Sequence, residues 1–424
     1  MKVFKFGGAS VKDANAVKNV AAILSLFEGE KITIVVSAMG KTTNKLEELV
    51  FALKQEDKKA FFNAVDDLQS FHQDILGELF PTGHFTLQNT IDGIFEQLKE
   101  RINRSVAENY AFEYDQIVSI GEVLSSHILS QFLIEKGFQA KWMDARTLVR
   151  TDNNYQEGGV DWKKTEQLIQ TRFMPQFENS DLLVTQGFVG HTPEGFTTTL
   201  GREGSDYTAA IFAFCGNSDS VTIWKDVPGM LNADPKYFSD TITLDSISFR
   251  EALELSYYGA SVIHPKTIKP LQNKGIPLYV KSFVDPHAEG TTIQESTAND
   301  TLIPSFIFKM NQVLVSFSPK DFSFIVEENL SDIFNKLAKL RLKINVMQNS
   351  ALNFSVATDG SKVDINELIA EFSDAYNVKY NEGLELITIR HYDDATIKRT
   401  TINKTIILEQ RTRQTARFLV KDNG

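Results

Sequence analysis

The sequence is poor in cysteine and in net positive charge. Cys215 is the single cysteine among 424 residues, so no intrachain disulfide can form, and a reducing compartment is indicated. The apolar run Ile211–Cys215 favours a small, buried thiol at this position. A formal net charge of -11 at pH 7 argues against a dedicated nucleic-acid binder, because phosphate backbones need a basic face.

We also find no sequence typical of a signal peptide or of a membrane-spanning helix. Met1–Gly8 is too short and too charged to be a signal peptide. We find no apolar run that approaches the ~20 residues needed to span a bilayer. We therefore expect a soluble, cytoplasmic protein that binds neither nucleic acid nor membrane. Its 42% hydrophobic and 23% charged residues are typical of globular proteins, and its length predicts two or three domains.

The first part of the chain alternates short apolar runs with helical patterns. Residues 3–6 and 32–36 are predicted strands, and between them residues 14–27 have helical spacing, which together predict a βαβ unit in a parallel sheet. Further strands are expected at 116–119, 139–143, 182–185, 221–224 and 278–281, and further helices at 121–136, 207–214 and 249–258. The predicted fold class is α/β with a mainly parallel sheet.

Two later features depart from this alternation. Residues of about 45–110 are helix-rich, which predicts a helical insertion covering one end of the sheet. Gly, Pro, Thr and Asn gather around 285–305 and indicate a domain boundary, so we expect domains at 1–295 and 306–424. Residues 312–380 have the order βαββαβ of a ferredoxin-like module. Strands at 384–390, 404–410 and 415–421 are expected to follow without helices between them.

A glycine-rich turn follows the first strand, in the sequence Lys-Phe-Gly-Gly-Ala-Ser of residues 5–10. Gly7 and Gly8 allow the backbone to approach a phosphate and point N–H groups at it, and a helix that follows directly would add its positive end. Lys5 ends the strand and can reach phosphates, because ligands of parallel sheets bind at that edge. A simple tight turn would share this pattern, and the chain has no Walker A motif.

A second polar stretch spans residues 197–210. Arg202, between two glycines, carries a planar guanidinium suited to a bidentate carboxylate contact. Ser205 or Asp206 could cap the helix that follows. The same sequence would also fit a capped helix N-terminus with a solvent-exposed arginine and no ligand.

Several motifs occur in one order along nearly the whole chain, and together they resemble the aspartokinases of the amino-acid kinase superfamily. The motifs are the turn at 5–10, Ser37 with Thr43-Asn44, Gly121-Glu122, Gln186-Gly187-Phe188, Thr-Thr-Leu-Gly-Arg-x-Gly-Ser-Asp at 198–206, Asp226-Val-Pro-Gly, Asp234-Pro235 and Tyr-Gly-Ala-x-Val-Ile-His-Pro at 258–265.

The resemblance implies a three-layer α/β/α kinase domain followed by ACT-type regulatory modules. It also implies ATP-dependent phosphorylation of the side-chain carboxylate of L-aspartate to 4-phospho-L-aspartate, the first step towards lysine, threonine and methionine. In the family pattern Lys5 and Asp206 are catalytic, and Asp206 orients the lysine. The ATP-binding residues would be Lys5, Gly7, Gly8, Ser10, Lys225, Asp226, Leu231, Lys236 and Ser261. The aspartate-binding residues would be Ser37, Thr43, Glu122, Arg202, Gly204 and Ser205.

The implied chemistry needs no general base, because a carboxylate nucleophile is already ionised at neutral pH. Catalysis would consist of in-line positioning and neutralisation of charge on the transferring phosphoryl group. The cofactors would be ATP and Mg²⁺, with the Mg²⁺ carried by ATP and not held by protein side chains.

Three departures from the family pattern stand out. Ser261 replaces a lysine that contacts ATP in aspartokinases, and we expect Lys225, or else Lys266, to supply the missing charge. Leu231 and Lys236 replace the usual Tyr and Arg. The stretch from residue 310 onward is too short for two full ACT modules, so we expect a complete module and an abbreviated second one, serving mainly to form a homodimer or higher homo-oligomer.

Two other functions stay open. The chain could be another kinase of the superfamily, acting on glutamate, acetylglutamate or carbamate, although Glu122, the 202–206 motif and the ACT-like tail favour aspartate. It could also be a non-catalytic amino-acid-binding regulator. Ser261 supports that function, whereas Lys5, Arg202 and Asp206 argue against it.

Overall fold

The computed structural model describes residues 1–103, 109–238, 240–260 and 263–423. The described residues form two compact units. The first unit consists of Met1–Leu231, Thr243–Leu253 and Ser261–Asp300, and the second of Asn232–Ile242, Glu254–Ala260 and Thr301–Gly424. Helix α9 (Phe249–Tyr258) begins in the first unit and ends in the second.

The first unit is built on a sheet with the strand order β3-β4-β2-β1-β7-β9-β10-β8. Pairing is parallel from β3 to β9, while β10 runs antiparallel to β9, so the predicted mainly parallel sheet is confirmed. The strands are β1 (Lys2–Phe6), β2 (Ile32–Val36), β3 (Ala140–Trp142), β4 (Leu182–Gln186), β7 (Ser220–Lys225), β8 (Ser246–Ser248), β9 (Leu278–Ser282) and β10 (Thr291–Gln294). A separate hairpin joins β5 (Val189–His191) to β6 (Thr197–Thr199).

The register of the central strands determines where a ligand can bind. Phe6, the last residue of β1, is paired with Val36 of β2 and with Trp224 of β7. The loops that follow these three strands therefore leave the sheet at one edge. Because ligands of parallel sheets bind outside the carboxyl ends of the strands, this edge is the expected position of a site.

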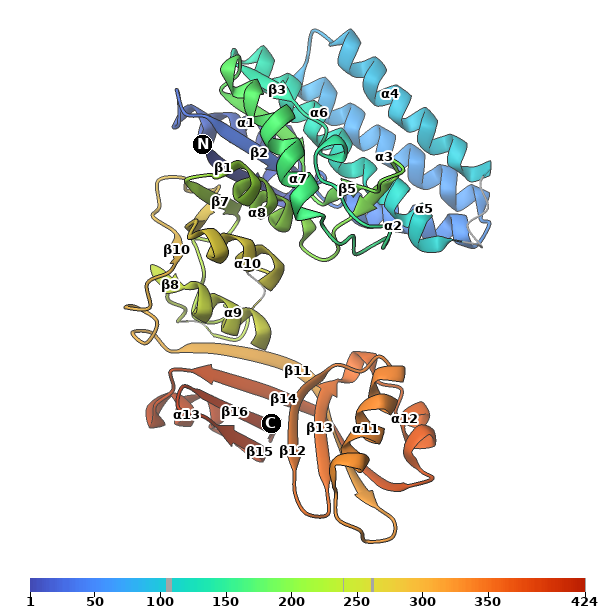
Figure 1. Ribbon diagram of the computed structural model, residues 1–424, viewed down its shortest axis with the longest axis vertical. Helices are drawn as coiled ribbons and strands as arrows, with labels where there is room; N and C mark the ends of the chain where they lie inside the picture. Colours follow the sequence, from blue (N-terminus) through green and yellow to red (C-terminus); the bar gives the residue numbers. More distant parts are fainter. Residues whose placement is uncertain (104–108, 239, 261–262, 424) are drawn as a thin grey trace. The chain divides into compact units, whose positions relative to one another are not determined.

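Helices cover both faces of this sheet, as the three-layer architecture requires (Figure 1). Helix α8 (Gly204–Gly216) contacts β1, β2 and β7, and α10 (Pro265–Lys274) packs on α8. The other face is covered by α1 (Ala14–Ser25) and α6 (Ile120–Glu135), whose apolar residues share one core with Phe4 and Phe6. A shorter helix, α7 (Trp162–Leu168), packs on α8.

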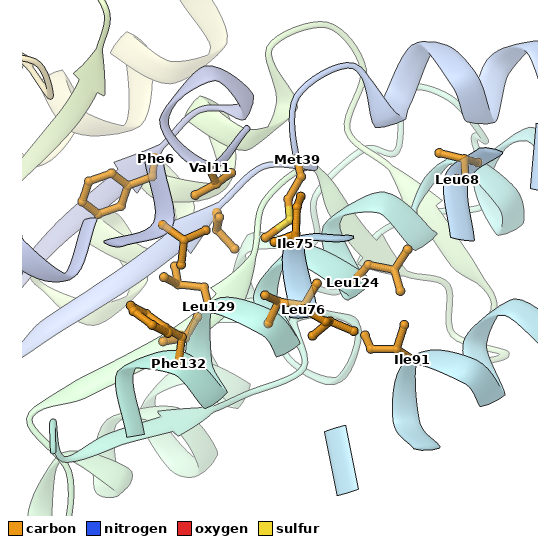
Figure 2. Packing of buried hydrophobic residues seen from close by; sticks show 14 of the residues in the cluster. Phe6, Val11, Met39, Leu68, Ile75, Leu76, Ile91, Leu124, Leu129 and Phe132 are labelled. Atoms are coloured by element: carbon orange, nitrogen blue, oxygen red, sulfur yellow. The ribbon is translucent and has the colours of Figure 1, made fainter. Parts of the chain in front are cut away.

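A block of helices occupies the part of the chain that was predicted to be a helical insertion. It contains α2 (Thr42–Lys54), α3 (Lys58–Leu79), α4 (Phe85–Glu100) and α5 (Tyr110–Val118), and α4 lies alongside α6 (Figure 1). Figure 2 shows apolar side chains of this block gathered with those of β1 and α6 in one core: Phe6, Val11, Met39, Leu68, Ile75, Leu76, Ile91, Leu124, Leu129 and Phe132.

Two sequence-based expectations fail at the end of this block. Residues 116–119, predicted as a strand, lie in α5 and in the turn before α6, because burial of Ile117 and Val118 against the core outweighs their preference for strands. The apolar stretch Tyr110–Glu135 is also long enough by composition to cross a membrane, which the sequence survey overlooked. In the structure 78% of its most apolar window is buried, as expected for a core helix.

The second unit contains an antiparallel sheet with the strand order β12-β13-β11-β14-β16-β15. Helices α11 (Glu327–Lys339) and α12 (Ile365–Phe372) pack on β11 and β13, which gives the predicted ferredoxin-like order from β11 to β14. The strands are β11 (Ser305–Pro319), β12 (Ile344–Asn349), β13 (Phe354–Asp359), β14 (Tyr376–Arg390), β15 (Lys404–Arg411) and β16 (Thr415–Asp422).

The end of the chain differs from the expected run of bare strands. The strands predicted at 378–380 and 384–390 are one strand, β14, which continues through the polar residues Asn381 and Glu382 and through Gly383 at a φ of 67°. A helix that was not predicted, α13 (Asp394–Thr401), separates β14 from β15. Its threonines are weak helix formers, but Asp393 and Thr396 form a capping box and Ile397 is buried against Ile387 and Phe418.

Candidate active site

A cleft of about 810 Å³ opens in the first unit at the carboxyl edge of β1, β2 and β7. Most of the predicted site residues line it: Lys5, Gly8, Ser37, Thr43, Glu122, Arg202, Gly204, Ser205, Asp206 and Lys225. These residues come from loops that are far apart in the sequence, and the register of the three strands brings them together.

The loop after β1 passes directly beside the loop after β2. A Cβ atom on Gly8 would lie 2.9 Å from the carbonyl oxygen of Ala38 and 3.0 Å from that of Gly40, so a side chain at residue 8 would collide with backbone. The expected helix does not begin here. A 3₁₀ turn, Gly8–Val11, intervenes, and α1 begins at Ala14 with Asp13 as its cap. The loop after β1 therefore has no room for a side chain at residue 8, and the 3₁₀ turn separates it from the N-terminus of α1.

Asp206 is a buried carboxylate that two lysines compensate. Lys5, near the end of β1, places its Nζ 2.6 Å from Oδ1 of Asp206, and Lys225, at the end of β7, places its Nζ 3.8 Å from Oδ2. The side chains of Lys5 and Asp206 are 10% and 4% exposed. Because β1 and β7 are adjacent parallel strands, the two ammonium groups reach the first turn of α8 from neighbouring positions.

Glu122, in the first turn of α6, is a second buried carboxyl group in the same cleft, and it is 3% exposed. Its Oε1 accepts a hydrogen bond from the Ala38 N–H at 3.3 Å, while its Oε2 has no hydrogen-bond partner in the described part of the chain. Burial raises the pKa of Glu122 to about 8, although the Ala38 N–H and the charge of Lys5 act in the opposite direction. At neutral pH Glu122 is therefore mainly a neutral acid.

Tight glycine packing fixes the turn that precedes α8. A Cβ atom on Gly187 would lie 2.5 Å from Cβ of Ser205, and one on Gly204 would lie 2.6 Å from Cδ2 of Phe188. The residue before α8 is Glu203, in the left-handed region with a φ of 54°. The expected capping by Ser205 or Asp206 is therefore wrong: both lie inside the first turn, and the Asp206 carboxylate is directed to the two lysines.

Asp115 of α5 supports the cleft wall and was missed by sequence reasoning. Its carboxylate accepts hydrogen bonds from the Gln156 N–H at 2.9 Å, from the Thr199 N–H at 2.8 Å and from the Thr199 hydroxyl at 2.7 Å. Burial raises its pKa to about 6. Gln156 and Thr199 both line the cleft, so this buried carboxylate links α5 to the segment that leads into Arg202.

Further residues line the cleft that were not predicted as site residues, although Phe188, Thr199 and Gly201 lie in the motifs quoted above. They are Ala38, Gly40, Glu47, Tyr110, Tyr114, Gln156, Glu157, Phe188, Thr199, Gly201 and Glu203. The hydroxyl of Tyr114 donates to Glu47 at 2.6 Å, which joins α5 to α2 at this wall. Tyr110 lies at the end of the predicted helical insertion and Tyr114 lies two residues before the strand predicted at 116–119, so neither residue was assigned to the cleft.

Some predicted ATP-binding residues lie outside the lining of the cleft. The Ser10 hydroxyl is buried and donates to the Trp224 carbonyl at 3.4 Å, which is a bond within the scaffold. Gly7 lies beside Lys5, since its Cβ would be 3.4 Å from the Lys5 Nζ. Asp226 and Leu231 do not line the cleft, Lys236 belongs to the second unit, and Ser261 lies outside the described residues.

The polar groups near this cleft do not form a metal-binding cluster. Groups of three or more His, Cys, Asp or Glu side chains that could hold a metal ion are absent from the described residues. His264 caps α10, where its Nδ1 accepts the Lys266 N–H at 3.2 Å, so its role is structural. Cys215 is buried, and its pKa is raised to about 12 by that burial, which confirms an unreactive thiol.

Comparisons with known proteins place this cleft in a family. The amino acid kinase family matches residues 1–282 of the chain. Lysine-sensitive aspartokinase 3 of Escherichia coli (strain K12) is 31% identical over 395 residues, which cover 91% of this chain and 86% of that protein. Aspartokinase 2, chloroplastic, of Arabidopsis thaliana is 28% identical and covers 91% of this chain and 71% of that protein. The bifunctional aspartokinase/homoserine dehydrogenase 2 of the same plant is matched over 42% of its length.

Solved structures show the same architecture along the whole chain. E. coli aspartokinase III in complex with lysine and aspartate, in the T-state, has a TM-score of 0.83 at 27% identity and covers 99% of this chain and 96% of that one. The same enzyme in complex with aspartate and ADP, in the R-state, has a TM-score of 0.81 at 27% identity and covers 100% of this chain and 96% of that one.

Replacing Glu122 by glutamine tests its protonation through the pH dependence of stability. The unfolded chain releases the Glu122 proton near the ordinary value of 4.5, whereas the folded chain keeps it up to about pH 8. Between these values the wild-type free energy of unfolding loses ~1.4 kcal/mol per pH unit through this group. We expect Glu122→Gln to remove that loss, so that urea unfolding shows the variant gaining stability relative to wild type as pH rises. A difference between the two proteins that does not change with pH would contradict this assignment.

Proposed function

Because this chain belongs to the aspartokinases, within the amino acid kinase family, we propose that it uses ATP to phosphorylate the side-chain carboxylate of L-aspartate. The product is 4-phospho-L-aspartate, and the reaction is the first step towards lysine, threonine and methionine. The observation that carries the proposal is the pairing of Asp206 with Lys5 and Lys225 in the cleft that also holds Glu122 and Arg202.

The two lysines supply the positive charge that phosphoryl transfer requires. Lys5 and Lys225 converge on Asp206 at the carboxyl edge of the sheet, and Asp206 holds their ammonium groups near the cleft. There they neutralise charge on the transferring phosphoryl group, which is the main task of the protein in such a reaction. Gly8 lets the backbone of the loop after β1 come close to the phosphates.

The divalent ion arrives with the nucleotide in this mechanism. We propose that Mg²⁺ is carried by the ATP phosphates, where it would supply further neutralisation of their charge. The predicted contacts of Gly7, Ser10, Asp226, Leu231, Lys236 and Ser261 with ATP stay part of the proposal. Ser10 differs from the others, because its buried hydroxyl already donates a hydrogen bond to the Trp224 carbonyl and so helps to hold the loop in place.

The amino-acid substrate is recognised by two opposite charges. Glu122 offers an unpartnered Oε2 in a buried position, which an ammonium group can compensate. Arg202 is exposed at the cleft and suits a carboxylate, while Ser37, Thr43, Gly204 and Ser205 add hydrogen-bonding groups. The nucleophile is the second carboxylate of the substrate, which is ionised at neutral pH and needs no base. The complex of the E. coli relative with aspartate and ADP supports this choice of ligands.

The second unit is, in this proposal, an ACT-type regulatory and dimerisation region. Two features support this role: the ferredoxin-like module from β11 to β14, and a smaller second half formed by α13, β15 and β16. We propose that two chains associate through this region into a homodimer or higher homo-oligomer, and that the enzyme acts in the cytoplasm without nucleic-acid or membrane partners.

Aspartate-dependent acyl phosphate formation tests the proposed reaction. The purified chain is incubated with ATP, Mg²⁺ and L-aspartate, and hydroxylamine traps the product as a hydroxamate. We expect hydroxamate with L-aspartate and none with L-glutamate. No hydroxamate from folded protein that still binds aspartate would favour a non-catalytic amino-acid-binding regulator, and hydroxamate with glutamate alone would favour another kinase of the superfamily.

Lys225→Met tests whether Lys225 compensates for the lysine that Ser261 replaces. Removing a charge that contacts phosphate should cost ~1.5–3 kcal/mol of transition-state stabilisation, so kcat/KM for ATP should fall about 10- to 150-fold. Lys225→Arg keeps the charge and should retain most of the activity, and Lys2→Met, at the first residue of β1 and outside the cleft lining, serves as a control. A change within about twofold for Lys225→Met would exclude this role.

A further inference from the structure

A second concave site lies in the first unit, in a groove between α7, α8 and α10. It has a volume of about 300 Å³ and shares no lining residue with the active-site cleft. The lining residues are Trp162, Tyr207, Phe214, Lys266, Lys269, Pro270 and Asn273. The volume is at the lower end of the range for small-molecule sites, so the groove suits a ligand of one ring and a short substituent.

One side of the groove is aromatic. The ring of Trp162 packs edge-on against Phe214, with centroids 5.0 Å apart, and against Tyr207, with centroids 6.2 Å apart. Tyr207 and Phe214 lie two turns apart on α8, so Trp162 of α7 spans the distance between them. All three rings are partly buried, and each leaves part of its surface to the groove. A flat apolar body can pack against this wall and against Pro270.

The other side of the groove carries uncompensated positive charge. Lys266 and Lys269 of α10 both line it, and within the described residues neither ammonium group has a carboxylate partner. Lys274, on the same helix, differs: its Nζ lies 3.4 Å from a carboxylate oxygen of Glu166 and donates to the Phe214 carbonyl and to Asn217. The groove therefore places two ammonium groups beside three aromatic rings.

We propose that this groove binds a small aromatic anion. The ring lies against Trp162 and Phe214, and the anionic group is held by Lys266 and Lys269, with the Asn273 side chain as a further polar contact. Each half of such a ligand matches one side of the groove. The aromatic side chains bury the ring of the ligand, and the two ammonium groups neutralise its negative charge. None of the residues predicted to bind ATP or aspartate lines the groove, and Lys266 enters it as the residue that the sequence offered, after Lys225, to compensate for Ser261.

A ligand in the groove would reach the back of the catalytic turn. The Nζ of Lys266 lies 3.5 Å from the position that a Cβ atom on Gly201 would occupy. Gly201 lines the cleft next to Arg202, and Tyr207 of the groove directly follows Asp206. An anion that draws Lys266 away from Gly201 therefore acts on the turn that carries Arg202 and Asp206. The groove is thus placed to change the activity of the cleft without occupying it.

Calorimetry on the full chain with 3-phenylpropionate as probe tests the proposal. We expect a Kd of about 1 mM or tighter. We also expect at least a tenfold weaker Kd for 3-phenylpropionamide, which lacks the charge, and for propionate, which lacks the ring. The double variant Lys266→Met/Lys269→Met should weaken probe binding at least tenfold, whereas Lys163→Met, which removes an exposed lysine of α7 outside the groove, should leave the Kd unchanged.

Two further arms keep the test independent of folding and of catalysis. Trp162→Leu removes the aromatic wall without touching a lysine and should weaken binding to a similar degree; near-ultraviolet circular dichroism checks that each variant is folded. Probe binding does not require turnover, so it can succeed even if no hydroxamate is formed. The proposal is overturned if the wild-type chain does not bind the probe, if the lysine and tryptophan variants bind it like wild type, or if ADP displaces it competitively, which would assign the groove to the nucleotide.

Discussion

A carboxyl group taken out of water must meet a positive charge, accept hydrogen bonds or keep its proton, and two carboxyl groups of the active-site cleft differ in this respect. Asp206 has Lys5 and Lys225 within ion-pair distance. Glu122, almost equally buried, has a single backbone N–H and an unpartnered Oε2, and its pKa rises to about 8. This difference separates two tasks. In the proposed mechanism, Asp206 positions the two lysines for the phosphates, and Glu122 binds the ammonium group of the substrate.

The scaffold enforces this difference through close packing. Parallel pairing of β1 with β7 brings both lysines to the same edge of the sheet. The contact of Gly187 with Ser205 leaves no room for a side chain and holds the first turn of α8, with Asp206, against that edge. On the other side, a Cβ atom on Gly121 would lie 2.8 Å from Cβ of Ala38, so α6 brings Glu122 directly under the loop after β2. These glycines are needed for close approach, which explains their place in the motifs.

The sequence predicted the parallel sheet and its helices, because strands and glycine turns leave local patterns, and the family resemblance predicted part of the cleft lining. It could not reveal contacts between distant segments. Asp115 looks like an ordinary helical residue until the fold brings Thr199 to it. Ser10 looks like a ligand contact until its hydroxyl meets Trp224. The polar residues Asn381 and Glu382 led to the prediction of two strands where β14 is one. Helix α13 was not predicted, because its threonines have low helix propensity and its cap, Asp393, was not recognised. In each case a long-range contact or a cap outweighed local preference.

Proton release on aspartate binding tests the central claim most directly. Isothermal titration calorimetry near pH 7, in two buffers with different ionisation enthalpies, counts the protons that leave the protein when the ligand binds. Because the ammonium group of aspartate should replace the Glu122 proton, we predict that about one proton is released. Succinate, which has no ammonium group, should release none, and neither should aspartate binding to Glu122→Gln. Aspartate binding without proton release, or with equal release from wild type and Glu122→Gln, would contradict the account.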